Sequence, residues 1–213
     1  MKLFEKYCAP SVQAQTSKDF DWYIIVDPSF PGLTKNHLST LSGYGTVLHC
    51  DSYWNEKCPE IAFAETRDGD ELCDLYLDQW VCSTRLDSDD MLEIDFFQRL
   101  KGLATEKEQF ISFPHGVIIK DGWAANRRYL QNPFISYIEY NDKGSMKTVF
   151  SVDHTKCDKA GVPLVEADDR AAWAQVDHGD NIKNSATRKV RNFDSNKYMS
   201  AILGSRFIWR HDG

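Results

Sequence analysis

Residues 80–92 read Trp-Val-Cys-Ser-Thr-Arg-Leu-Asp-Ser-Asp-Asp-Met-Leu, an apolar run that ends abruptly at three acids. The run is short, β-branched and aromatic, which predicts a buried strand. Asp87, Asp89 and Asp90 would then follow the carboxyl end of that strand, where open α/β sheets bind ligands. The stretch therefore predicts an α/β fold with a binding site at these acids.

Carboxylates crowded at one strand end raise one another's pKa unless a cation or hydrogen-bond donors compensate. A divalent metal is the simplest physical reason to gather them, and oxygen ligands favour Mg²⁺ or Mn²⁺ over zinc. The alternative is a solvated turn whose last acid caps a helix that begins near Met91. We set aside a calcium EF-hand loop, because its sixth position requires glycine and the sixth residue from Asp87 is Leu92.

The composition is that of a globular protein of 213 residues with a net charge of -7. A chain of this length predicts one domain. The acidic balance argues against a nucleic-acid partner or an anionic membrane surface. The six cysteines include no C-x-x-C pair, so we expect reduced thiols. The chain shows no signal peptide and no apolar window of membrane-spanning length, which predicts a cytoplasmic protein without an integral membrane segment.

The first half of the chain alternates between helical and strand patterns. This alternation is typical of a mostly parallel sheet flanked by helices. The expected elements are a helix over residues 3–14 with Pro10 at a kink or junction, a strand over 20–26 that ends at Asp27, a helix from Thr34 to Gly43, a strand over 46–50, and helices over 71–80 and 91–103.

The second half is richer in strand and loop patterns. Residues 110–114 and 117–119 predict a hairpin around His115-Gly116. Residues 132–139 and 148–152 predict two strands that flank a turn at 141–144.

Near residue 180 a second group of candidate metal ligands and bases follows an apolar run. The run covers residues 171–176, and Asp177-His178-Gly179-Asp180-Asn181 comes directly after it. The tail beyond Asn184 is basic. Three other histidines, His49, His115 and His154, have no partner that the sequence reveals, so a structural role is their default interpretation.

Four motifs together resemble the GT-A glycosyltransferases, which use nucleotide-sugar donors, and within them the rhamnosyltransferase family. The first is a helix with Gln15-Thr16, followed by the strand that ends at Asp27. The second is Ser83-Thr84-Arg85-Leu86-Asp87-Ser88-Asp89-Asp90, which is similar to a T-R-L-D-x-D-D element and contains the DxD signature. The third runs from Trp173 through Asn184 and is similar to an H-G-x-N element. Asn132-Pro133-Phe134 is a weaker fourth.

The resemblance implies a GT-A-like, Rossmann-like α/β fold over residues 1–213. Residues 1–105 would bind the nucleotide-sugar, residues 106–184 would form a β- and loop-rich acceptor and catalytic half, and residues 185–213 would be a basic tail. GT-A chains usually open with a strand before the first helix, and this chain starts almost at the helix. We therefore expect the usual first strand to be absent, which bears on nucleotide affinity.

The resemblance also implies roles for residues at two strand ends. Asp89 would be the principal metal ligand, and Asp87 would contact the ribose or share the metal through water. His178 would add a metal or phosphate contact. Asp27 would accept a hydrogen bond from the base or the ribose, and Arg85 would neutralise the acids or reach the diphosphate. The implied metal is Mn²⁺ or Mg²⁺.

Inverting transfer needs a general base, which the family resemblance implies to be a carboxylate, to take the proton from the acceptor hydroxyl. Asp177, Asp180 and Glu139 are the candidates for this general base. The expected function is metal-dependent, inverting transfer of a sugar, rhamnose by the family name, from a UDP- or dTDP-linked donor to a saccharide acceptor in polysaccharide assembly.

Two alternatives differ in class from this transferase. A sugar nucleotidyltransferase would use acids and Mg²⁺ on a related sheet, but it would need a glycine-rich basic loop near its first strand, and none is visible. A non-catalytic, truncated transferase-like binding domain is favoured by the missing first strand.

Overall fold

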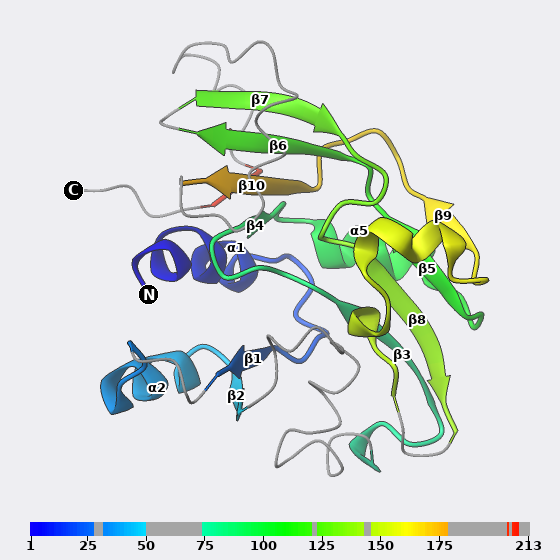
Figure 1. Cartoon of the computed structure of the whole chain (residues 1–213), viewed down its shortest axis with the longest axis horizontal. Coiled ribbons are helices and arrows are strands. Elements are labelled where there is room, and N and C mark those ends of the chain that lie inside the picture. The colour runs from blue at the N-terminus through cyan, green and yellow to red at the C-terminus, as the bar shows by residue number, and fades with distance from the viewer. Residues whose placement is uncertain are drawn as a thin grey trace.

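The computed structural model of the chain describes residues 1–27, 32–49, 74–120, 123–142, 146–178, 204 and 206–208. Within these ranges the protein has a mixed α/β structure with one two-stranded and two four-stranded sheets (Figure 1). The α/β class agrees with the sequence prediction. None of the helices in these ranges is long and apolar enough to span a bilayer.

The chain begins with the predicted amphipathic helix. A π-helical turn, η1 (Phe4–Cys8), leads into α1 (Ala9–Gln13). The backbone N–H of Ala9 donates to the carbonyl of Phe4, five residues back. Pro10 follows in the first turn of α1, where its missing N–H is tolerated. Proline therefore lies at a junction, as predicted.

A βαβ unit follows the helix. Strands β1 (Tyr23–Val26) and β2 (Thr46–His49) pair in parallel, and α2 (Lys35–Ser42) connects them. The Thr34 side chain caps α2 by accepting from the backbone N–H of His37 at 3.3 Å. Gly43 is its C-cap. These local predictions are confirmed.

The second sheet has the strand order β4-β10-β6-β7. Strand β10 is parallel to β6 and antiparallel to β4, and β6 and β7 form an antiparallel hairpin. The sequence pattern did not predict β7. The bounds are β4 (Met91–Leu92), β10 (Trp173–Asp177), β6 (His115–Lys120) and β7 (Trp123–Arg128).

The predicted helix over 91–103 is wrong at its start. Met91 and Leu92 belong to β4, and the helix, α5 (Phe96–Leu103), begins four residues after Leu92. Both side chains are fully buried, but in different apolar clusters. Consecutive side chains on a strand point to opposite faces, so a strand can bury both, whereas an amphipathic helix buries one face.

The third sheet has the order β3-β8-β5-β9. Strand β3, which was predicted to be buried, lies at the edge of this sheet, and Trp80 and Cys82 on it are exposed. Hydrophobic content alone does not distinguish an edge strand from a central one. The bounds are β3 (Gln79–Thr84), β8 (Ser136–Asn141), β5 (Gln109–Ser112) and β9 (Leu164–Glu166).

The strands in the described part of the chain do not form the predicted mostly parallel sheet. Four of the seven strand pairings among the described residues are antiparallel, namely β10 with β4, β3 with β8, β5 with β8, and β6 with β7. The alternating pattern identified strands but not their partners. A strand's direction depends on which distant segment it meets.

Three further local predictions need correction. Strands β5 and β6 lie in different sheets, so residues 110–119 do not form a hairpin. Residues 149–151 are a short 3-10 helix, η2 (Val149–Ser151), followed by a second, η3 (His154–Lys159). Only residues 74–75 are helical in the described part of 71–80. Residues 143 and 144 of the predicted turn at 141–144 lie outside the described residues.

The main core lies between the two four-stranded sheets and α5. Trp173 is at its centre, fully buried and stacked on Phe134 with 5.0 Å between ring centroids. Its indole N–H donates to the carbonyl of Phe113 at 2.8 Å. Gly116 is its register partner on β6 and leaves room for the ring.

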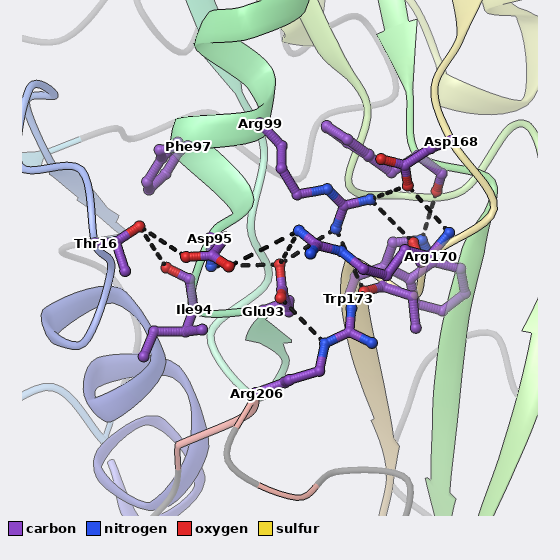
Figure 2. Close-up of polar contacts among 12 residues, drawn as sticks. Thr16, Glu93, Ile94, Asp95, Phe97, Arg99, Asp168, Arg170, Trp173 and Arg206 are labelled. Atoms are coloured by element: carbon purple, nitrogen blue, oxygen red, sulfur yellow. Dashed lines mark hydrogen bonds and ion pairs between the residues drawn. The ribbon is translucent and has the colours of Figure 1, made fainter.

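Figure 2 shows a charged cluster around Glu93, the residue that follows β4. Glu93 is completely buried, and its carboxylate lies 3.2 Å from Arg99, 3.2 Å from Arg206 and 3.8 Å from Arg170. A buried carboxylate requires such compensation. Arg206 also donates to the carbonyl of Ala171 at 2.9 Å. The cluster therefore joins Arg206, near the C-terminus, to the segment that follows the acidic turn and β4.

The Gln15-Thr16 motif holds the N-terminal helix against the same segment. The side-chain amide of Gln15 donates to the carbonyl of Glu93 at 2.7 Å and accepts from the backbone N–H of Phe97 at 3.2 Å. The Thr16 hydroxyl donates to Asp95 at 3.0 Å (Figure 2). These contacts give the motif a structural role.

Candidate functional site

The acidic turn at residues 87–90 connects β3 to β4 and lies between the N-terminal helix and β10. Leu86 packs in the cluster formed by the N-terminal helix, β1, β2 and α2. The pKa of the buried Cys8 thiol is raised, first by burial and then by the charges of Asp90, Asp89 and Asp87. Figure 1 shows α1 beside β4, which starts where the turn ends. Three elements distant in sequence therefore meet at the acids.

Asp90 anchors the turn to β10. Its carboxylate is buried and accepts from the backbone N–H of Val176 at 2.8 Å. Burial, followed by the charges of Asp89 and Asp87, raises the pKa of Asp90 well above its usual value. Asp90 does not cap a helix at Met91, because β4 stands there.

Asp89 and His178, two of the predicted metal ligands, are in contact. The Nε2 atom of His178 lies 2.8 Å from Oδ2 of Asp89. Asp89 comes from the turn and His178 from the end of β10, and their side chains are 20% and 23% exposed. The contact brings a carboxylate and an imidazole from two distant segments together at one partly exposed point.

Asp87, the third predicted ligand, is bonded to Arg85. The Nε and Nη2 atoms of Arg85 donate to Oδ1 of Asp87 at 3.0 and 2.9 Å. Arg85 thus neutralises one acid of the turn, which is one of the two roles expected for it. No group of three or more His, Cys, Asp or Glu side chains forms a metal-binding cluster within the described ranges.

The candidate bases occupy different surroundings. Asp177 is 5% exposed and forms an ion pair with Lys120, its register partner on β6, at 3.2 Å. Glu139 lies on β8 opposite Val81 of β3, before the acidic turn. Asp180 lies outside the described residues. The general base therefore stays a prediction.

Glu139 supports the chain after β8. Its buried carboxylate accepts from the backbone N–H groups of Lys147 at 2.8 Å and Thr148 at 2.7 Å. Burial raises its pKa above the ordinary 4.5, and the two hydrogen bonds oppose that shift. The folded state therefore binds this proton more tightly than the unfolded state does.

This raised pKa predicts a pH-dependent stability. Glu139 contributes most to the free energy of unfolding below pH 4.5, and the contribution falls as the pH rises through the folded-state pKa, with a slope of at most about 1.4 kcal/mol per pH unit. Glu139→Gln should remove this decline, and should also cost stability because an amide offers one accepting oxygen instead of two. Urea unfolding from pH 4.5 to 8 measures both effects. The exposed Glu106→Gln is the matched control, and equal slopes in the two variants would contradict the assignment.

Asp27 follows the end of β1, as predicted, and is partly exposed. An open groove of about 770 Å³ lies at the opposite end of β1 and β2, where Trp22, Tyr44 and Thr46 line it. None of the predicted site residues lines this groove. We therefore place the site at the acidic turn, on the chemistry of its side chains.

A group that sequence reasoning missed lies beside Arg85. The guanidinium carbon of Arg85 is 6.0 Å from the ring centroid of Phe150, and His154 follows on η3. The ring of His154 meets that of Tyr129 edge to face at 6.3 Å. These residues come from separate segments with no shared motif, so no sequence signal joined them.

Comparison with known proteins gives one family match. A family model described as "Putative rhamnosyl transferase" matches residues 1–191 of the 213. The matched range contains all four motifs and every candidate site residue. No curated protein matches the chain. The family match confirms the resemblance drawn from the motifs.

Proposed function

Because the chain belongs to the putative rhamnosyl transferase family, a family of glycosyltransferases, we propose that it transfers a sugar from a nucleotide-sugar donor to a saccharide acceptor with inversion. The donor would be UDP- or dTDP-linked, with rhamnose as the sugar that the family name suggests. The β1-α2-β2 unit and the acidic turn would form the nucleotide half of a GT-A-like fold.

The observation that carries the proposal is the contact between Asp89 and His178. Carboxylate oxygen and imidazole nitrogen are ligands that Mn²⁺ accepts, and Mg²⁺ and Mn²⁺ also bind through carboxylates with substrate phosphates and water completing the coordination. The residues therefore fit a site that the donor diphosphate would complete. A cation bound there would neutralise the charge that develops on the departing diphosphate.

The neighbouring residues have complementary roles in this proposal. Asp87 accepts a hydrogen bond from the ribose, and Arg85 holds Asp87 in place and faces the diphosphate with its positive charge. Asp27, at the end of β1, accepts from the base or the ribose. Asp90 positions the turn by its bond to β10.

Calorimetric titration of UDP and dTDP into the protein, with and without Mn²⁺, tests this function. We expect one of the nucleotides to bind, and to bind at least tenfold more tightly with the metal, because the cation joins Asp89 and His178 to the diphosphate. The corresponding nucleotide-sugar should then be consumed when saccharide acceptors are added. Binding without turnover would instead indicate a non-catalytic binding domain. If folded protein binds neither nucleotide, the transferase proposal fails.

A further inference from the structure

Three ring side chains from different elements are linked to the Arg85 and Asp87 pair: Phe150 by its contact with the guanidinium, His154 by the charges of both residues, and Tyr129 through its ring contact with His154. Phe150 of η2 lies under the Arg85 guanidinium at 6.0 Å, His154 begins η3, and Tyr129 follows β7. All three are partly exposed. Aromatic rings of this kind can pack against the apolar face of a sugar. The group therefore offers a surface next to the proposed donor site.

The hydrogen bond of His154 determines its tautomer. The Nδ1 atom lies 2.6 Å from the carbonyl oxygen of Gln131, which only accepts, so Nδ1 carries the proton. In the neutral imidazole the Nε2 atom is then an acceptor. This is the arrangement in which a backbone carbonyl orients a histidine that takes a proton at its other nitrogen.

The loop that supplies this carbonyl is held rigidly. Asn132 is fully buried, and its side-chain amide donates to the carbonyls of Phe113 and Tyr129, both at 2.9 Å. Its oxygen accepts from the backbone N–H of Phe134 at 2.9 Å. The Asn132-Pro133-Phe134 motif therefore fixes the neighbouring Gln131 carbonyl, and fully buried Cys157 fixes η3 from the other side.

Electrostatics favours the neutral form of His154. Burial lowers its pKa, the bond to Gln131 raises it, and the charge of Arg85 lowers it further. Asp153 and Asp87 are the acids whose charges act in the opposite direction. The histidine thus responds electrostatically to the same Arg85 and Asp87 that the donor site uses.

The described carboxylates that could compete for the role of base have other partners. Asp177 is almost fully buried and paired with Lys120 at 3.2 Å. Glu139 is buried and accepts from two backbone N–H groups. His154 combines partial exposure, a ring held by the Gln131 carbonyl and an accepting nitrogen, and the charges of Arg85 and Asp87 act on it.

We propose that Tyr129, Phe150 and His154 form the subsite for the acceptor saccharide, and that Nε2 of His154 takes the proton of the attacking hydroxyl. The inference rests on the proposed transferase function. The acceptor oxygen forms a bond to the anomeric carbon while the bond from that carbon to the diphosphate oxygen breaks. The electron pair of the broken bond leaves with the nucleoside diphosphate, and the hydroxyl proton moves to Nε2.

Two substitutions separate a proton acceptor from a structural histidine. His154→Asn keeps an amide donor near the position of Nδ1, and so the bond to Gln131, but has no Nε2. His154→Gln places an amide near the position of Nε2 and loses the bond to Gln131. We expect both variants to lower the transfer rate by about 100-fold or more, the loss typical of a missing general base. His154→Asn should keep its nucleotide Kd within about twofold and its melting temperature within about 2 °C.

The pH dependence of the transfer rate distinguishes a histidine that accepts a proton from one that only packs. The wild-type transfer rate should fall as His154 is protonated, below pH 6.5, and the residual rate of His154→Asn should lack that acidic limb. His115→Asn, a partly buried histidine on β6 outside both subsites, is the matched control and should behave like the wild type.

The outcomes distinguish this inference from the proposed function. If the wild type binds no nucleotide and transfers no sugar, the function itself fails and the inference falls with it. If the wild type is active and His154→Asn transfers within threefold of it, the inference alone is wrong. Loss of folding or nucleotide binding in both variants would show a structural histidine and would also contradict it. The inference predicts that His154→Asn binds the nucleotide as the wild type does but loses most of its transfer rate.

Discussion

Asp89→Asn is expected to weaken Mn²⁺-dependent nucleotide binding by at least tenfold and to lower sugar transfer by about 100-fold or more. Asparagine has nearly the same shape as aspartate, so the turn should keep its fold, but the amide lacks the negative charge that a cation requires. The substitution changes the carboxylate whose Oδ2 atom contacts His178 at 2.8 Å. Calorimetry measures the binding, and release of the nucleoside diphosphate measures the turnover.

The matched control is Asp169→Asn, which removes the same charge from an exposed position before β10. Its binding and turnover should equal those of the wild type, while both variants keep the wild-type melting temperature. His178→Asn should weaken metal dependence in the same direction as Asp89→Asn, because the two side chains would share the cation. Full activity in Asp89→Asn would show that transfer does not need the charge of Asp89, and would contradict the proposed role of the acidic turn.

Gly116→Ala is expected to destabilise the fold by about 3 kcal/mol, the upper part of the range for overpacked cores. A Cβ at this position would lie 2.1 Å from the indole ring of Trp173. The ring has little freedom to move, since it stacks on Phe134 and donates to the carbonyl of Phe113. Urea unfolding measures the loss as a lower midpoint.

Gly102→Ala is the control for the same change of residue. Gly102 lies near the end of α5 with nothing within 4 Å of an added Cβ, so alanine there should be neutral or stabilise by about 0.5 to 1 kcal/mol. A second check combines Gly116→Ala with Trp173→Leu, which removes the clashing ring. The two losses should then be less than additive. Equal stabilities of the two alanine variants would contradict the proposed steric conflict.

Several features of the fold were predictable because their signals are local. Thr34 and Gly43 bracket α2 as predicted, and the apolar runs before Asp27 and at β2 became strands. A cap or a strand propensity depends on a few consecutive residues, so it can be recognised without knowing the rest of the chain. The same holds for the acid-rich turn, whose composition is conspicuous by itself.

The partners of these elements were not predictable in the same way. Met91 and Leu92 were assigned to a helix because their apolar side chains fit either structure, and only pairing with β10, some 80 residues later, makes them a strand. The hairpin predicted around Gly116 failed because β5 and β6 join different sheets. Sheet membership is a long-range property, since it depends on which surfaces meet.

The candidate site shows the same division. Residue types and spacing marked the acid-rich turn and the cluster after residue 176, and the family resemblance assigned roles to Asp87, Asp89 and His178; the family match supports the motifs that contain them. Packing of β4 against β10 decided that Asp89 meets His178 and that Asp90 is a buried anchor. The path of the chain after β8 decided that Glu139 accepts from two backbone N–H groups. The chemistry of each side chain is known from the sequence, because it belongs to a single residue. Which side chains touch, and how far burial shifts their pKa values, depends on contacts between segments far apart in the chain.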